Sequence, residues 1–249
     1  MNILEKYSVN CGVKIGRASP ASSYFPLKDQ RYIVIDDRNK YSSNIYELFS
    51  DVLAHIQKSL DEKNIKVYSF NINEKNLLPG TQPFVNLTKK QEAYLIKNSM
   101  LTVSCDNLSV YYASALNVPS IGLYSAYPAA CTEPLWGTKH TSIESDWLGR
   151  LPSYGVEETP KAINFIKPEQ VALAILDKLG LPPTFSVETI YMGDLYPTKI
   201  VEVIPDFTTA LDFLQGRAIN LRADYHFNEE LVVHWLQGRV VNLLIDRPI

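Results

Sequence analysis

Cysteine is scarce in this chain of 249 residues. The three cysteines, Cys11, Cys105 and Cys131, are odd in number, and none lies in the Cys-x-x-Cys spacing typical of a zinc or redox site. The four histidines show no ligand spacing with cysteines or carboxylates. The sequence therefore predicts no metal site and a reducing compartment, which we take to be the cytoplasm.

Long hydrophobic runs and an excess of positive charge are also missing. The longest apolar stretches, such as residues 231–235 and 240–245, are far shorter than the roughly 20 residues that cross a bilayer. Residues 1–14 lack the apolar run of a signal peptide. Lys and Arg number 24 against 27 Asp and Glu, a net charge of -3 that disfavours nucleic acid as the main partner. We expect neither a membrane span nor a nucleic-acid partner.

The residues that are present follow the pattern of a globular α/β domain. Residues 32–35 form an apolar run that indicates a buried strand, and apolar residues at helical spacing over 44–62 predict an amphipathic helix. Pro168 and Gly180 favour the start and end of another helix. The same reasoning predicts strands at 66–70, 84–85, 101–104 and 119–124, and helices at 89–98, 108–116 and 168–179. This order describes a Rossmann-like parallel sheet that is covered on both faces.

The double proline at 182–183 marks the best domain boundary. We expect an N-terminal arm or linker at 1–30, a Rossmann-like domain at 31–182 and a smaller α/β domain at 185–249 that stops after a strand. No internal repeat is apparent. The smaller domain is predicted to contain strands at 187–191, 199–204, 218–221 and 239–245, and helices at 207–214 and 228–237.

The most informative stretch is 101–125, where a predicted strand runs directly into a helix. Asp106 or Asn107 caps that helix, and the free amides and dipole of a helix N-terminus favour a phosphate. Small side chains at Ala113 and Ala115 allow the helix to lie close to the sheet. The stretch resembles the motif of heptosyltransferases of glycosyltransferase family nine: Asp-Thr-Gly-x-x-His, Ala-x-Ala, then Pro and a strand. The resemblance covers about residues 31–145, and its matches are Asp106, Ala113, Ala115, Pro119 and the turn at 123–125.

The resemblance implies the donor-binding half of a two-domain GT-B glycosyltransferase. Such a half-domain binds a nucleotide diphosphate sugar as donor substrate and needs no further cofactor. The helix start would face the diphosphate, the loop after the first strand would supply cations and hydroxyls, and the turn after 123 would lie beside the sugar. The implied binding residues are Arg38, Lys40, Ser42, Asp106, Asn107, Leu108, Tyr111, Tyr124 and Ser125.

Departures from the motif leave several functions open. Asn107 and Leu108 replace the family's Thr-Gly, and Tyr111 replaces its histidine, which removes a titratable group. Asp106 can also be a simple helix cap, and Arg38 and Lys40 can be solvated surface charges.

Only some 30 residues precede the donor-type domain, so the acceptor domain and its catalytic base are missing, and we name no base. The chain therefore pairs with another subunit or a second copy, is part of a longer protein, or has lost the reaction. The first hypothesis is a glycosyltransferase-like protein whose residues 31–182 bind a nucleotide diphosphate sugar. Heptosyl-type transfer to an unknown acceptor, by inverting displacement, follows if the missing acceptor part is supplied. The alternatives are a non-catalytic binding or assembly module, and a sugar-nucleotide epimerase or other GT-B relative.

Overall fold

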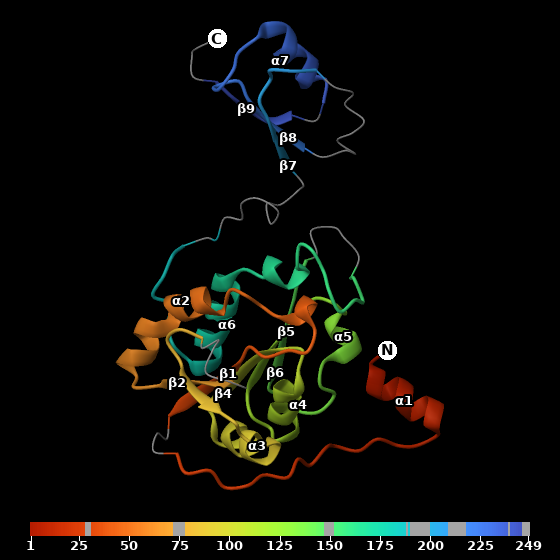
Figure 1. Ribbon diagram of the computed structural model, residues 1–249, viewed down its shortest axis with the longest axis vertical. Coiled ribbons are helices and arrows are strands. Elements are labelled where there is room, and N and C mark those ends of the chain that lie inside the picture. Colours follow the sequence, from red (N-terminus) through yellow and green to blue (C-terminus); the bar gives the residue numbers. More distant parts are fainter. Residues whose placement is uncertain are drawn as a thin grey trace. The chain divides into compact units, whose positions relative to one another are not determined.

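The protein divides into two compact units, Met1–Ile190 and Tyr191–Ile249. Figure 1 shows both units in the computed structural model of the chain. The structure describes residues 1–27, 31–71, 78–146, 152–187, 189, 200–208, 218–238 and 240–245.

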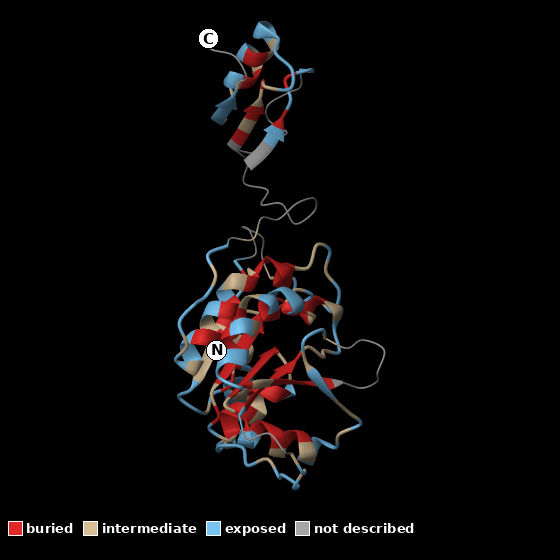
Figure 2. Ribbon diagram, turned by 90° about the vertical axis from the view of Figure 1, so that its left-hand side faces the viewer, coloured by how far each residue is buried: buried red, intermediate tan, exposed pale blue. Residues whose placement is uncertain are grey.

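Unit 1 contains a six-stranded sheet whose strands are all parallel. This arrangement confirms the predicted Rossmann-like sheet. In spatial order the strands are β3 (Gln82–Val85), β2 (Lys66–Asn71), β1 (Tyr32–Asp36), β4 (Leu101–Cys105), β5 (Ser120–Tyr124) and β6 (His140–Glu144). Every residue of β1, β4 and β5 is buried, and Figure 2 shows these central strands inside the unit. Their continuous apolar runs reflect burial on both faces.

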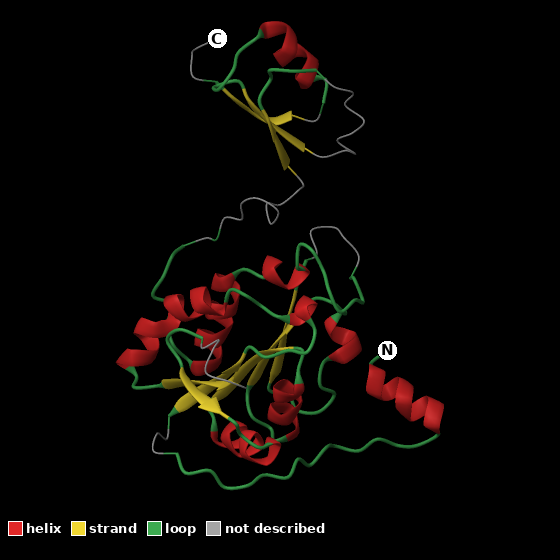
Figure 3. Ribbon diagram, in the orientation of Figure 1, coloured by secondary structure: helices red, strands yellow, loops and turns green. Residues whose placement is uncertain are grey.

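Helices cover both faces of this sheet (Figure 3). Ile33 and Ile35 of β1 share a core with α2 (Phe49–Glu62) and α6 (Pro168–Leu179). Tyr32 and Val34, which alternate with them, share a second core with α3 (Lys89–Asn98) and α4 (Leu108–Ala115). One strand therefore supplies both cores.

Helix caps explain why several predicted boundaries are correct. Thr88 and Gln91 form a reciprocal capping box at the start of α3. α6 begins at Pro168 and ends before Gly180, whose φ of 67° is the left-handed conformation that glycine adopts easily.

The predicted helix at 44–62 is wrong at its start, because α2 begins at Phe49. Residues Ser42–Asn44 form a short 3-10 helix, η1, instead. The backbone of Ser43 donates to the carbonyl of Val156 (3.2 Å), and its hydroxyl donates to the carbonyl of Gly155 (2.8 Å). These long-range bonds hold η1 against another loop, which helical periodicity does not show.

Three further elements lie where we predicted none: α1 (Ile3–Cys11), α5 (Ala129–Thr132) and β6. No residue of α1 is buried, so it carries no clear core-facing stripe. The side-chain amide of Asn2 donates to the carbonyl of Glu133 (2.8 Å), and the Arg17 guanidinium donates to that of Ala115 (2.9 Å). These bonds tie the N-terminal segment to unit 1. A second 3-10 helix, η3 (Ala162–Phe165), precedes α6.

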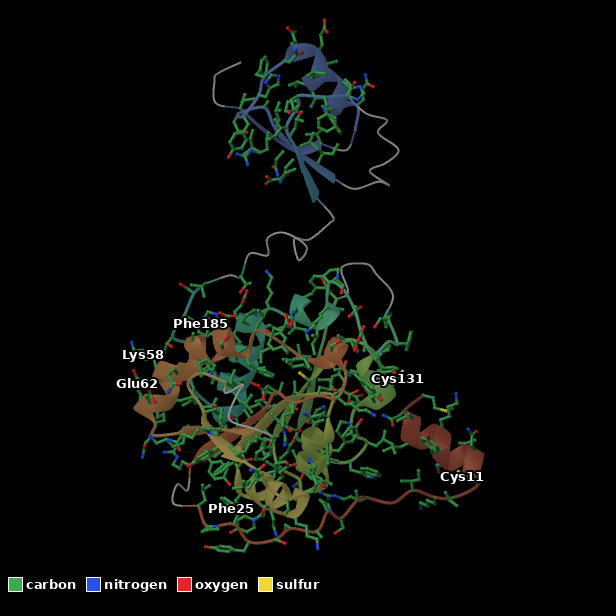
Figure 4. The ribbon with its side chains drawn as sticks, in the orientation of Figure 1. Cys11, Phe25, Lys58, Glu62, Cys131 and Phe185 are labelled. Carbon is green, nitrogen blue, oxygen red and sulfur yellow. The ribbon has the colours of Figure 1, made fainter. Side chains whose placement is uncertain are left out.

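The segment after α6 also packs on unit 1. Phe185 stacks on the His55 ring of α2, with ring centroids 4.6 Å apart, and Figure 4 labels Phe185 beside this helix. The hydroxyls of Thr184 and Ser59 lie 3.2 Å apart.

Unit 2 is a three-stranded parallel sheet with the order β7-β8-β9. Its elements are β7 (Ile200–Val203), β8 (Ala218–Arg222), α7 (Glu229–Leu236) and β9 (Val240–Leu244). Trp235 of α7 is fully buried against Ile219 and Leu221. The predicted strands at 199–204, 218–221 and 239–245 and the helix at 228–237 are confirmed. Most of the predicted strand at 187–191 and helix at 207–214 lies outside the described residues.

Our expectation of no internal repeat is wrong for unit 2. The sequence Leu-Gln-Gly-Arg-x-x-Asn-Leu-x-x-Asp occurs at 214–224 and again at 236–246. The sheet register pairs Asn220 with Asn242 and Leu221 with Leu243, so each residue lies beside its equivalent in the other copy. Such stacking in register is typical of repeat structures, in which each copy buries its apolar face on the next.

No helix in the described part of the chain is both long and apolar enough to cross a membrane.

Candidate functional site

The candidate site lies at the carboxyl ends of β1 and β4 in unit 1. The strand order reverses between these two strands, because β2 and β3 lie on one side of β1 and β5 and β6 lie beyond β4. In open parallel sheets, ligands bind in the crevice outside such a reversal point. The loop after β1 and the start of α4 form this edge.

The N-terminus of α4 is capped by Asn107, which decides between the two predicted caps. The Asn107 side-chain oxygen accepts from the backbone amide of Ser109 (2.8 Å). Leu108, the first residue of α4, is 44% exposed. The positive end of the helix dipole is therefore open to an anion beside this leucine.

Hydrogen bonds join the loop after β1 to the start of α4. The side-chain amide of Asn39 donates to the carbonyl of Asp106, and that of Asn107 donates to the carbonyl of Arg38, both at 2.9 Å. The Ser109 hydroxyl donates to the Asp36 carboxylate (2.6 Å). The fold thus brings Arg38 together with Asp106, Asn107 and Leu108, as the resemblance implies.

Arg38 is engaged in a buried ionic cluster. Its guanidinium donates to Asp36 at 2.7 and 3.0 Å and to Glu92 of α3 at 2.8 Å. It also lies over the Phe70 ring, 5.1 Å from the centroid. Both carboxylate residues are only 2% exposed. Burial alone raises the pKa of Glu92, but hydrogen bonds from Arg38 and Lys89 outweigh burial and lower it. Arg38 therefore neutralises two buried carboxylates and holds the loop in place.

Lys40 is the exposed cation of the same loop. Its ammonium group lies 5.4 Å from the centroid of the Tyr41 ring. Within the described ranges Lys40 has no ion pair, so its charge is available to an anionic ligand.

Ser42 and Ser125 lie on one side of this edge and bond to backbone carbonyls. The Ser42 hydroxyl donates to Val156 (3.2 Å). Ser125 is buried, and its hydroxyl donates to the carbonyl of Ser43 (3.4 Å). Both hydroxyls therefore bond to the loops around the site.

Asp106 and Tyr111 form a polar pair along α4. The Tyr111 hydroxyl donates to Asp106 (3.3 Å) and to the carbonyl of Thr132 at the end of α5. Burial raises the pKa of Asp106, and burial together with the Asp106 charge raises that of Tyr111. Tyr111, at the place of the family histidine, links α4 to α5.

The hydroxyl of Tyr124 bonds within the sheet instead of at the β1/β4 edge. It lies 3.0 Å from Nε2 of His140, whose Nδ1 is 2.8 Å from the Ser120 hydroxyl. The Tyr124 ring lies over Gly122, where an added Cβ would come within 2.6 Å of the tyrosine oxygen. Burial lowers the pKa of His140 to about 4, which favours the neutral imidazole.

Sequence reasoning missed four residues of these networks: Asp36, Asn39, Glu92 and His140. The polar run at 36–40, directly after the apolar residues 32–35, is a signal that could have identified Asp36 and Asn39. Glu92 is 54 positions from Arg38, and no local pattern connects them.

The three cysteines are free thiols that lie on different elements of unit 1. Cys11 on α1 is exposed, Cys131 on α5 is partly buried, and both are free thiols (Figure 4). Burial raises the pKa of Cys105 to about 12, which suits a packed thiol. In the residues that the structure describes, no group of three His, Cys, Asp or Glu could hold a metal ion.

No family model matches the sequence, and no curated protein gives a significant match. Solved structures do match. The dodecameric iron-containing heptosyltransferase TibC, in complex with ADP-D-beta-D-heptose, gives a TM-score of 0.52 at 14% identity, over 68% of this chain and 51% of TibC. A second structure of TibC, from enterotoxigenic E. coli H10407, gives a TM-score of 0.50 at 13% identity and covers 68% of this chain and 50% of TibC. The structure of E. coli ADP-heptose LPS heptosyltransferase II gives a TM-score of 0.47 at 16% identity and covers 70% of this chain and 50% of that enzyme.

This chain spans about half of the length of these structures. At such identities the likeness concerns the fold. Over 68% of its residues, the chain has a heptosyltransferase-like α/β fold.

Proposed function

We propose that unit 1 binds a nucleoside diphosphate sugar at the β1/β4 edge, with the diphosphate at the N-terminus of α4. The observation that carries this proposal is the reversal of strand order, which sets the exposed Leu108 end of α4 beside the loop after β1. The TibC structure of the same fold holds ADP-heptose, which supports this ligand class.

The proposed ligand contacts divide into direct and indirect ones. Lys40 supplies the cation, and the first turn of α4 at Asn107 and Leu108 supplies the dipole. Arg38 positions the loop, because its guanidinium already binds Asp36 and Glu92. Asp106 and Tyr111 set the start of α4 against α5. Ser42 and Ser125 hold the loops around the site, whereas Tyr124 is buried in the sheet, where its hydroxyl bonds to His140.

Glycosyl transfer also needs an acceptor site and a base. We propose that a partner subunit, a second copy or a further part of the protein supplies them. An assembled enzyme would agree with the dodecameric state that is described for TibC. Transfer would then displace the nucleoside diphosphate with inversion at the sugar carbon.

Calorimetric titration of the full chain with ADP, UDP, GDP and CDP tests the donor site. Leu108→Glu places a carboxylate where the diphosphate would lie, whereas a negative charge at a helix start does not destabilise the helix. Leu108→Gln is the uncharged control. We expect one nucleotide to bind saturably, and Leu108→Glu to weaken it at least about tenfold, or about 1.4 kcal/mol, with little change for Leu108→Gln.

Lys40→Ala tests the cation, and Lys63→Ala, just after α2, is its control. Lys40→Ala should weaken binding and reduce its dependence on salt, because one screened charge contact is lost. Absence of binding by all four nucleotides at millimolar concentration would refute the donor site.

One observation favours the second candidate, a non-catalytic binding or assembly module. The bonds from Asn39, Asn107 and Ser109 already join the end of β1 and its loop to the start of α4. A chain that binds no nucleotide while it retains this network would have kept the fold for another role.

A further inference from the structure

Two tyrosine rings, those of Tyr127 and Tyr154, meet near the carboxyl end of β5. Tyr127 follows this strand directly, whereas Tyr154 lies in a later loop. The ring centroids are 5.5 Å apart and the rings meet edge to face. Neither residue belongs to the two hydrophobic cores of unit 1, and Tyr154 is 58% exposed. This tyrosine pair therefore presents aromatic surface that the core does not use.

Hydrogen bonds fix the loop that carries Tyr154 on two sides. The backbone amide of Tyr154 donates to the carbonyl of Ala126, directly after β5 (3.0 Å). The carbonyls of the two residues after Tyr154 accept from the hydroxyl and the backbone amide of Ser43, at 2.8 and 3.2 Å. Ser43 belongs to η1, which follows Lys40 in the loop after β1. The tyrosine pair is thus held beside the loop of the candidate site.

The backbone of Tyr154 has an unusual conformation. Its φ is 51°, in the left-handed region that bulky side chains rarely adopt. Among the described residues, the three others with a positive φ that are not glycine are asparagines, which tolerate this region better. Strained positions persist only where the surrounding structure holds them, and they cluster at ligand sites. The strain at Tyr154 therefore points to a role of its ring in binding.

The position of the tyrosine pair in the sheet indicates which part of a ligand it contacts. β5 lies next to β4, and neighbouring strands are about 4.7 to 4.9 Å apart. In the proposed function the diphosphate lies at the start of α4, directly after β4. The donor sugar and the ribose are bonded directly to the diphosphate, whereas the base lies one ring farther away. Of the two sugars, the donor sugar must be reachable by an acceptor, which agrees with the exposure of Tyr154.

We propose that the tyrosine pair binds the sugar of the nucleoside diphosphate sugar. This inference rests on the proposed function, because it places the sugar relative to the diphosphate. The face of an aromatic ring is an apolar surface on which the C–H groups of a sugar can pack, and a tyrosine hydroxyl can bond to sugar hydroxyls. Tyr154 then discriminates between a nucleotide that carries a sugar and one that does not.

Calorimetric titration of the full chain with matched ligands tests this role. ADP, UDP, GDP and CDP lack the sugar, and ADP-glucose, UDP-glucose, GDP-glucose and CDP-glucose carry it. Tyr154→Asn removes the ring and suits the positive φ, whereas Tyr154→Phe keeps the ring. We expect Tyr154→Asn to weaken the sugar nucleotide about fivefold and to leave the free diphosphate unchanged. Tyr154→Phe should retain most of the affinity for both ligands.

The outcomes distinguish this inference from the donor site itself. If none of the eight ligands binds, the proposed function fails and the tyrosine assignment fails with it. If a nucleotide binds but Tyr154→Asn changes neither ligand, only the tyrosine assignment is wrong. Equal weakening of the free diphosphate and its glucose ester would place the ring against the ribose or the base, and would also overturn the assignment.

Saturation-transfer difference NMR locates the contact even if Tyr154→Asn impairs folding. Saturation of the aromatic protons of the protein should reach the glucose protons of the bound sugar nucleotide. Tyr127→Leu removes the other ring and leaves the loop of Tyr154 unchanged in sequence, and it should reduce this transfer, whereas Tyr127→Phe should not. Equal transfer in the two variants at position 127 would overturn the assignment.

Discussion

Each unit contains an arginine that lies between two carboxylates and over an aromatic ring at the end of a parallel strand. In unit 1, Arg38 binds Asp36 and Glu92 and covers Phe70. In unit 2, Arg222 donates to Asp224 at 2.7 Å and to Glu202 at 3.4 Å, and lies 4.2 Å from the centroid of the Tyr225 ring.

The two clusters differ in burial. The carboxylate side chains around Arg38 are each 3% exposed, whereas those around Arg222 are 25% and 48% exposed. If Arg222 is lost, water can solvate the two carboxylates around it. If Arg38 is lost, water cannot reach its two buried carboxylates in the same way. We therefore expect loss of the arginine to destabilise unit 1 far more than unit 2.

Arg38→Ala should have the largest effect. It leaves two buried carboxylates without their main cation, a change that costs about 3 to 5 kcal/mol. The loss should be greatest at neutral pH. Because the folded pKa of Glu92 is lowered, the wild-type gain is present above the usual glutamate pKa and disappears as the pH falls through the lowered value. Amide hydrogen exchange of unit 1 peptides at several pH values measures both effects, and equal protection of variant and wild type would contradict them.

A partly buried base, His140, offers a further test of the role of burial in unit 1. Its folded pKa of about 4 lies below the usual 6.5, so the unfolded chain binds the proton first as the pH falls. Unit 1 should therefore lose stability from about pH 6.5 to about 4, by roughly 1 to 2 kcal/mol since the ring is partly exposed. His140→Gln should flatten this dependence in urea unfolding, while the same change at exposed His226 in unit 2 is the control. If the stability of His140→Gln still falls steeply between pH 6.5 and 4, a group other than His140 causes the pH dependence.

Asn220→Ala tests a polar contact in unit 2. The change removes the acceptor of the Asn242 amide, which remains accessible to water. We expect a cost of about 0.5 to 1.5 kcal/mol, typical of one hydrogen bond, measured by exchange of unit 2 peptides. A cost above about 3 kcal/mol would show that the asparagine pair is as critical as a buried cluster.

Arg222→Ala should have the smallest effect. Its carboxylates remain hydrated, so exchange in unit 2 should change far less than exchange in unit 1 does for Arg38→Ala. Similar losses for the two variants would refute the explanation from burial.

Elements that are buried on both faces, or capped locally, could be predicted from the sequence. β1, β4 and β5 are uninterrupted apolar runs, and Thr88, Pro168 and Gly180 set helix ends through neighbouring backbone groups. β6 was missed because only Ile143 among its residues is buried, so its pattern is weak. α1 was missed because it buries no residue.

The location of the candidate site could be predicted from the sequence, but most hydrogen-bond partners of its residues could not. The junction of β4 and α4 is visible in the sequence, and Asp106, Asn107 and Leu108 lie there. The partners of Arg38 and Tyr124 were not predictable, because Glu92 and His140 reach them only through the order of the strands and helices.

The sequence by itself determined the alternation of strands and helices, the caps of α3 and α6, and the helix start at the proposed site. These features depend on the side-chain periodicity and backbone preferences of residues near one another in the chain. Only the tertiary structure decided that Arg38 neutralises buried carboxylates, that His140 holds Tyr124, and that Asn220 lies beside Asn242. These pairings depend on sheet order and register, which join residues far apart in the sequence and change their energies through burial.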